Sequence, residues 1–169
     1  MHEWFELIDP KAIAGDIKLI KKFDNPCYKG SEDFFFKKDN HIIIYSQKWM
    51  TLFGNSELAA DQIEIPASAI QWIIDTIEIK FFKPPSEGGL PADKFHHKET
   101  IEGELLKINR GVSTGGEGIG GYRLLNLSRK KHTLDTWNQE YAMPDPFLFE
   151  HGLMNSLKDL AGKIQRREI

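Results

Sequence analysis

The feature that most constrains the fold is a run of strands followed by one amphipathic helix, which occurs twice along the chain. In residues 31–82 and again in residues 99–169, β-branched and aromatic stretches precede a helix with apolar residues at helical spacing. Such a helix must bury its stripe against another layer. The stripes are Ile70, Ile73, Ile74 and Ile77, then Leu153, Leu157, Leu160, Ala161 and Ile164. We therefore predict an α+β fold of antiparallel sheets, each followed by an amphipathic helix.

The two halves also end alike. Ile65-Pro66-Ala67-Ser68 precedes the first helix, and Met143-Pro144-Asp145-Pro146 precedes the second. This likeness indicates an internal duplication. The alternative is that helices follow strands in many α+β domains, so that two such passages arise independently. The pattern alone leaves both explanations open.

The N-terminal region, residues 1–30, is expected to hold a short helix and a loop. Asp9-Pro10 has an N-cap acceptor followed by a proline that fits a first helical turn. Ile13, Ile17 and Ile20 then recur at i, i+4 and i+7, and Lys21-Lys22 suit a helix C-terminus. The spacing predicts a helix over residues 10–22.

A proline- and glycine-rich stretch separates the halves. It begins at Pro84-Pro85 and reaches Pro91, and it predicts a linker over residues 83–98. A chain of 169 residues suits one domain. Residues 1–169 are therefore expected to form a single domain whose halves share one core.

Charge and cysteine content limit the function classes. The formal net charge is −3, which predicts no general attraction to polyanions, so a nucleic-acid binder would have to cluster its cations locally. Cys27 is the single cysteine, which excludes an intrachain disulfide and a cysteine-built metal cage and favours a reducing compartment. The first residues do not resemble a secretory signal, and no apolar run approaches a membrane span. We expect a soluble, cytoplasmic protein.

No motif predicts catalysis, a cofactor or a metal. The run Gly116–Gly121 matches a dinucleotide-binding glycine pattern, but strand-like sequence follows it where that motif needs a helix. The histidines have no ligand spacing, and Cys27 has no histidine beside it in the sequence that would act as a base. We therefore predict a non-enzymatic protein without cofactor.

Basic residues alternate with aromatic ones on the predicted strands. A protein that binds single strands needs cations for the phosphates and flat rings on which bases stack, and one sheet face can present both. The candidate nucleic-acid-binding residues are Lys48, Trp49, Lys107, Tyr122 and Arg123. The alternative is that the basic side chains simply lie in solvent on the outer face of a sheet while the aromatic rings fill the core.

The order of elements resembles one known superfamily. The stretch from Asn40 to Trp49, followed by Gln62–Pro66 and the isoleucine helix, is similar to the single-stranded nucleic-acid-binding regulators of the positive cofactor four, Whirly and PUR-alpha type. Residues 121–164 look like a second copy. The resemblance implies a curved antiparallel sheet followed by a helix, used twice, and single-stranded DNA or RNA as partner.

A second function class fits the same sequence. A protein–protein interaction module, such as a bacterial toxin-immunity protein, also needs no catalytic residues, and mild acidity would speed its association with a basic partner. The sequence leaves the oligomeric state open.

Overall fold

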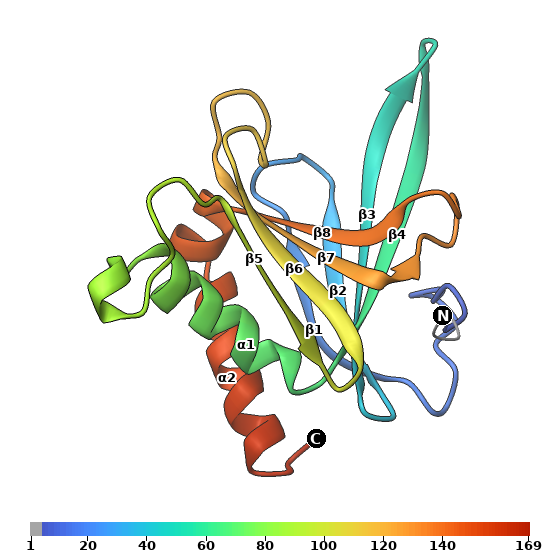
Figure 1. The fold of residues 1–169 in the computed structure, drawn as a ribbon. Coiled ribbons are helices and arrows are strands. Elements are labelled where there is room, and N and C mark those ends of the chain that lie inside the picture. Colours follow the sequence, from blue (N-terminus) through green and yellow to red (C-terminus); the bar gives the residue numbers. More distant parts are fainter. Residues whose placement is uncertain (1–4) are drawn as a thin grey trace.

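The computed structural model describes residues 5–169, which form two four-stranded antiparallel sheets, each followed by helical segments (Figure 1). Both sheets are meanders in chain order. The first contains β1 (Lys18–Asp24), β2 (Glu32–Lys38), β3 (His41–Leu52) and β4 (Asn55–Pro66). The second contains β5 (His96–Ile101), β6 (Glu104–Gly111), β7 (Gly121–Lys130) and β8 (Asn138–Pro144). The predicted α+β class and antiparallel sheets are confirmed.

Helical segments follow the last strand of each sheet. After β4, α1 (Ala69–Asp75) continues as the π-helix η1 (Thr76–Phe81), and a 3₁₀ turn, η2 (Pro85–Glu87), lies beyond it. After β8, the π-helical η3 (Pro146–Glu150) leads into α2 (Leu153–Gln165). Both predicted apolar stripes face the core, with only Ile164 partly exposed. Within residues 5–169, no helix is long and apolar enough to cross a membrane.

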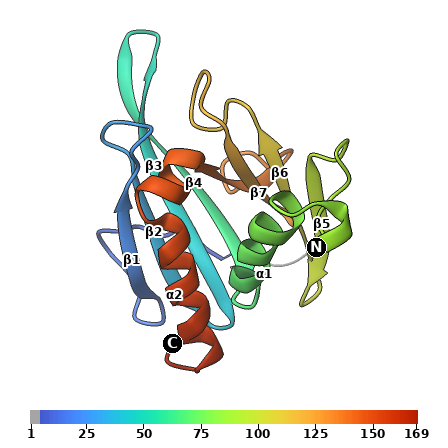
Figure 2. The ribbon, with the colours of Figure 1, turned by 90° about the vertical axis from the view of Figure 1, so that its left-hand side faces the viewer.

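The main core lies between the two sheets and the two helices. α2 lies along the first sheet, and α1 lies beside it, toward the second sheet (Figure 2). We call the sheet faces that point into this core the inner faces. Alternate strand residues fill it, since neighbouring side chains on a strand point to opposite faces. The strand residues Ile42, Ile44, Ile63, Leu106 and Leu124 are fully or almost fully buried there.

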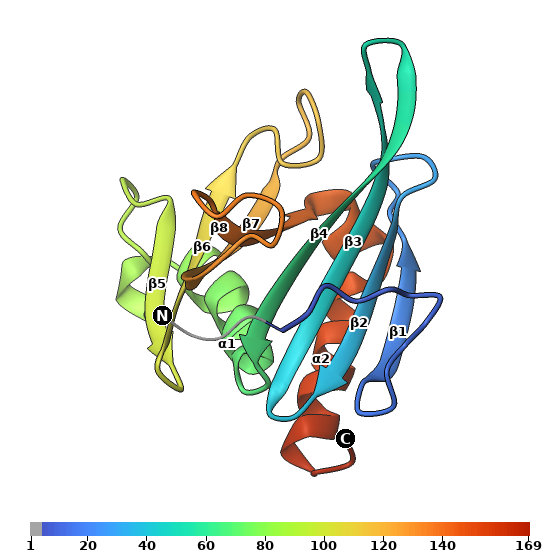
Figure 3. The ribbon, with the colours of Figure 1, turned by 90° about the vertical axis from the view of Figure 1, so that its right-hand side faces the viewer.

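The opposite face of the first sheet carries a second apolar cluster, made of Ile8, Phe34, Phe36, Ile43 and Tyr45. Phe5 and Ile17 pack against it from the N-terminal segment. Figure 3 shows this segment crossing the strands on the side away from α2. Because both of its faces are covered here, the first sheet has consecutive buried residues where one open face would give alternation.

The helix predicted over residues 10–22 is wrong. Residues 18–24 form the edge strand β1, which pairs with β2, and residues 10–16 form turns and irregular chain. The Asp9 carboxylate accepts the Lys11 N–H at 2.9 Å, a local turn bond, and Gly15 follows. Isoleucine is a middling helix former and a good strand former, so the free edge of β2 decides the conformation.

The segment predicted as a linker is partly ordered against the first helix. The Leu90 N–H donates to the Lys80 carbonyl at 2.7 Å, which folds the chain back on η1. β5 begins at His96, inside the range 83–98, and pairs with β6. The proline-rich stretch is thus shorter than the prediction.

Away from the helices, β4 packs directly on β7 and β8 through buried polar groups. The Asn126 side chain donates to the Glu64 carbonyl at 2.7 Å, and the Glu64 N–H donates to the Gln139 side chain at 2.9 Å. Arg129 of β7 lies 3.7 Å from the Glu64 carboxylate of β4, and within the second sheet it donates to the Glu104 carboxylate from Nε at 2.7 Å and from a terminal nitrogen at 2.8 Å. Buried polar groups of this kind stabilise only when they are paired. The two sheets therefore form one unit.

Candidate functional site

A cleft of about 340 Å³ lies where the β3–β4 hairpin leaves the body of the protein. β3 pairs with β2 only as far as Gln47, so the rest of the hairpin projects with both edges unpaired by other strands. The cleft lies between the base of this hairpin, the β1–β2 loop and strands β7 and β8 of the second sheet. Its polar lining includes Ser31, Asp33, Ser46, Lys48, Arg123 and Tyr141.

The floor of the cleft joins the two sheets through a carboxyl–phenol pair. Tyr141 donates to the Asp33 carboxylate at 2.7 Å, and Ser46 hydrogen-bonds the same carboxyl group. Burial raises the pKa of Asp33 to about 6, against the opposing effects of Tyr141, Ser46 and the Lys48 charge. Burial and the nearby Asp33 charge raise the pKa of Tyr141 well above its usual value. Near neutral pH the floor therefore presents an ionised carboxylate and a neutral phenol.

One wall of the cleft is a chain of ion pairs. Arg123 contacts Glu140 at 3.1 Å, and Lys131 contacts Glu140 at 2.9 Å and Asp61 at 3.4 Å. Burial opposes the ionisation of Glu140, but Lys131 and Arg123 together lower its pKa. This wall is close to neutral overall and fixes the position of Arg123 at the mouth of the cleft.

Lys48 supplies a third cation of the cleft, beside Arg123 and Lys131. Its Nζ lies 5.3 Å from the centroid of the Tyr28 ring, and among residues 5–169 it forms no ion pair. The side chain is exposed. Lys48 is therefore available to an anionic group.

The outer face of the second sheet adjoins this cleft and carries more cations. The register of β5 to β8 places Lys98, Lys107 and Arg123 on the face opposite the core. Glu140 is the acidic residue that the same register places on this face. No helix covers this face (Figure 1). A three-to-one excess of cations on an open sheet attracts anions locally, even though the chain is acidic overall.

The structure brings some of the predicted binding residues together and separates others. Lys48 and Arg123 both line the cleft, and Lys107 lies on the adjoining sheet face. Trp49 is 59% exposed and belongs to the opposite face of the hairpin, beside Gly30. Tyr122 is only 4% exposed, because its ring packs in the core against Phe81 and the Arg110 guanidinium. The ring of Tyr122 is therefore not accessible to a base.

Sequence reasoning missed the floor of the cleft. The signal in the sequence is Asp33 directly before Phe34-Phe35-Phe36, a carboxylate at a position of the strand that alternation places on the same face as Phe35. Its partner Tyr141 is distant in sequence, so only the packing of β2 near β8 shows the pair.

A second polar cluster lies beneath the N-terminal segment, and its side chains hydrogen-bond one another. Burial opposes the ionisation of Glu104, yet hydrogen bonds from Arg129, His41 and Asn126 hold its pKa well below the usual range. The bond to Glu64 raises the pKa of His132, whose ring also meets the Phe5 carbonyl at 2.6 Å. Within residues 5–169, no three His, Cys, Asp or Glu side chains are grouped so as to hold a metal ion. This cluster acts as a structural link between the sheets.

Comparison of the chain with protein-family models, with curated protein sequences and with solved structures finds no match.

Proposed function

We propose that this chain is a non-enzymatic module that binds single-stranded nucleic acid across the outer face of its second sheet and into the adjoining cleft. The observation that carries the proposal is the grouping of Lys98, Lys107 and Arg123 on an uncovered antiparallel sheet that leads to Lys48. Cations on a sheet track phosphates, and the groove beside them admits bases.

The order of elements supports the same proposal. Each half runs through four antiparallel strands and then a helix, which is the order expected from the resemblance to the positive cofactor four, Whirly and PUR-alpha type. We propose that the halves arose by internal duplication. Fold-level likeness is an analogy and does not by itself establish a function, so the cationic surface remains the main argument.

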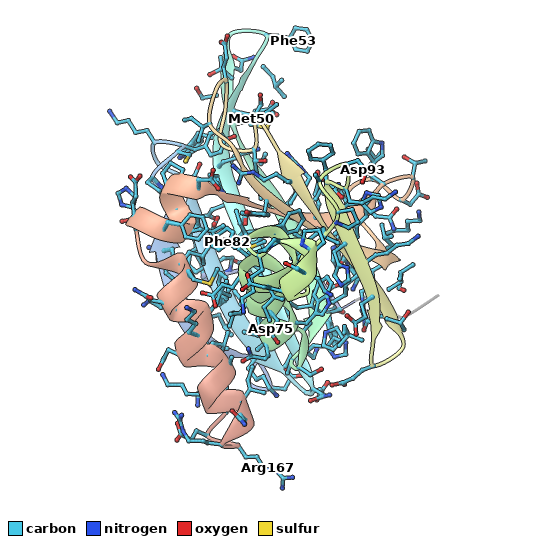
Figure 4. The ribbon with its side chains drawn as sticks, turned by 60° about the vertical axis from the view of Figure 1, so that its left-hand side comes forward. Met50, Phe53, Asp75, Phe82, Asp93 and Arg167 are labelled. Carbon is cyan, nitrogen blue, oxygen red and sulfur yellow. The ribbon has the colours of Figure 1, made fainter. Side chains whose placement is uncertain are left out.

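Aromatic stacking would come from the hairpin and not from Tyr122. Trp49 is largely exposed, and Phe53 at the tip is fully exposed; Figure 4 shows Phe53 pointing away from the hairpin turn, with Met50 lower on the same hairpin. Exposed rings of this kind offer faces to unstacked bases, at about 1–3 kcal/mol per base.

The test is a fluorescence titration of the protein with single-stranded oligonucleotides over a series of salt concentrations. We expect the logarithm of the affinity to fall linearly with the logarithm of salt concentration, because phosphate contacts release counterions. Binding that is absent at low salt, or that does not depend on salt, would refute the proposal.

One observation favours a second candidate, a protein–protein interaction module such as a toxin-immunity protein. Four apolar side chains besides Phe53 are exposed on the projecting hairpin, namely Trp49, Met50, Leu52 and Leu58. Exposed apolar groups gathered on one element commonly mark a protein-binding surface. Recovery of a specific protein partner by the wild-type chain, but not by a Phe53→Ser variant, together with no oligonucleotide binding, would favour this candidate.

A further inference from the structure

The floor of the cleft contains a hydroxyl group that the protein itself does not satisfy. Ser31 is 4% exposed and lines the cleft, and its Oγ has no hydrogen-bond partner among residues 5–169. A buried hydroxyl without a partner costs free energy, and buried polar groups are rarely left so. The unpaired Oγ lies beside an open cleft, so a polar ligand that reaches it would supply the missing hydrogen bond.

The neighbouring carboxylate determines which polar groups the floor accepts. Asp33 lies two residues after Ser31 and accepts hydrogen bonds from Tyr141 and Ser46. An ionised carboxylate has about four lone-pair positions, so two acceptor positions remain. The Tyr141 proton is already directed at Asp33. The floor therefore favours a ligand with N–H donors and disfavours one that presents only carbonyl oxygens.

The mouth of the cleft has one cation that can meet an anion. Lys48 forms no ion pair among the described residues, whereas Arg123 is paired with Glu140. The volume of about 340 Å³ lies at the lower end of the range for small-molecule sites, about 300–1,000 Å³. A nucleotide carries an anionic group at one end and, on three of the bases, an amino donor at the other, so it matches these features of the cleft.

We propose that the cleft takes one unstacked base that carries an exocyclic amino group, which donates to Asp33 while the phosphate of the same nucleotide contacts Lys48. Adenine, cytosine and guanine carry such an amine, and carboxylates accept from the cytosine amine in direct base readout. Thymine and uracil have no exocyclic amine, and their one ring donor, N3–H, stands between two carbonyl oxygens that would lie against the Asp33 carboxylate. This inference rests on the proposed binding of single strands and adds base selectivity to it.

The experiment compares oligo-dC with oligo-dT, each of about ten nucleotides, by fluorescence titration near neutral pH. The two pyrimidines are matched in size. For the wild-type protein we expect about tenfold tighter binding of oligo-dC. Asp33→Asn supplies an amide that can donate to a carbonyl oxygen, so this variant should lose or reverse the preference. Ser31→Ala should reduce it, and Lys11→Ala, on the N-terminal segment, should retain it.

Each outcome decides a different point. No binding of either oligonucleotide by the wild-type protein would overturn the proposed function together with this inference. Equal binding of both would overturn the inference alone, and so would a preference that persists in Asp33→Asn and Ser31→Ala. If Asp33→Asn fails to fold in a thermal melt, Ser31→Ala, which removes one hydroxyl, decides the question.

Discussion

Tyr141 of β8 donates a hydrogen bond to Asp33 of β2 at 2.7 Å, so that one strand of each sheet contributes to the same buried pair. The pair joins the two sheets and places a carboxyl group and a phenol on the floor of the cleft.

Replacement of Tyr141 by Phe should destabilise the protein by about 1–3 kcal/mol, since it leaves the buried Asp33 carboxylate without one of its donors. It should also raise the pKa of Asp33 further, because the bond from Tyr141 lowers it. Urea unfolding and NMR titration of Asp33 measure the two effects. Tyr45→Phe is the matched control, since Tyr45 is also buried and makes no side-chain hydrogen bond within residues 5–169. Equal effects of both substitutions would contradict the prediction.

The raised pKa of Asp33 makes stability depend on pH. The pKa of Asp33 is about 6 in the folded state and 3.8 for an ordinary aspartate, so the folded state binds the proton more tightly. The free energy of unfolding therefore falls as the pH rises from about 4 to above 6. The difference of about two units corresponds to about 3 kcal/mol. Asp33→Asn removes this dependence. The unfolding free energy of the variant, relative to wild type, should therefore be higher at neutral pH than near pH 4; a difference that is constant with pH would argue against the shift.

Two arginine–glutamate pairs should respond very differently to the same substitution. Arg129 is buried with Glu104, so Arg129→Met leaves an unpaired buried charge and should cost about 3–5 kcal/mol. Arg166 makes two contacts with Glu168 at the exposed C-terminus, and Arg166→Met should leave stability unchanged within error. Chemical denaturation of both variants provides the comparison. A small effect at Arg129 would contradict the cost expected for leaving the Glu104 carboxylate buried without its arginine.

The tip of the β3–β4 hairpin has a residue that is poorly suited to its backbone. Phe53 has φ of +50° and Gly54 has φ of +81°, as a two-residue type I′ turn requires. Phe53→Asn, which gives the favoured Asn-Gly pair, should stabilise the hairpin by about 1 kcal/mol. Amide exchange of residues 48–58 reports this change. Phe53→Ala leaves a non-glycine residue other than Asn at the positive φ, so it should slow the amide exchange of the hairpin little. Equal slowing of exchange in Phe53→Asn and Phe53→Ala would exclude turn strain as the cause.

The same tip gives a functional comparison. If Phe53 stacks on a base, both substitutions should weaken oligonucleotide binding by a similar factor, even though only Phe53→Asn stabilises the turn. Tighter binding by the stabilised variant would instead assign the hairpin a purely structural role.

The cations on the outer sheet face should control the salt dependence of binding. Lys98→Ala combined with Lys107→Ala should reduce the slope of log affinity against log salt by about 1.4, about 0.7 for each phosphate contact that is lost on a single strand. The exposed Lys11, on the N-terminal segment, is the control position. An unchanged slope in the double variant would place the nucleic acid elsewhere on the protein.

Much of the fold follows from local patterns in the sequence. The stripes of isoleucine and leucine give the helices, and the β-branched runs give most strands, because burial of one face dictates these spacings. The N-terminal helix was wrong because Ile17, Ile20 and Lys21 suit either a helix or an edge strand, and pairing with β2 is a tertiary effect. β5 was missed because His96-His97-Lys98 has no apolar alternation.

The site was harder to predict than the fold. In the run from Tyr122 to Leu127, apolar residues occur at both neighbouring and alternate positions, so the sequence does not reveal which ones face inward. The register with β6 and β8 turns Tyr122 into the core and Arg123 outward. The pairing of Asp33 with Tyr141 depends on how two distant strands meet, which no local pattern contains.

The buried contacts between Glu64, Asn126 and Gln139 have a consequence for any attempt to divide the chain. If the backbone were cut in the exposed proline-rich loop, each fragment would carry complementary polar groups that only the other fragment can satisfy. Neither fragment would be an autonomous folding unit, and mixing the two should restore the native state by complementation.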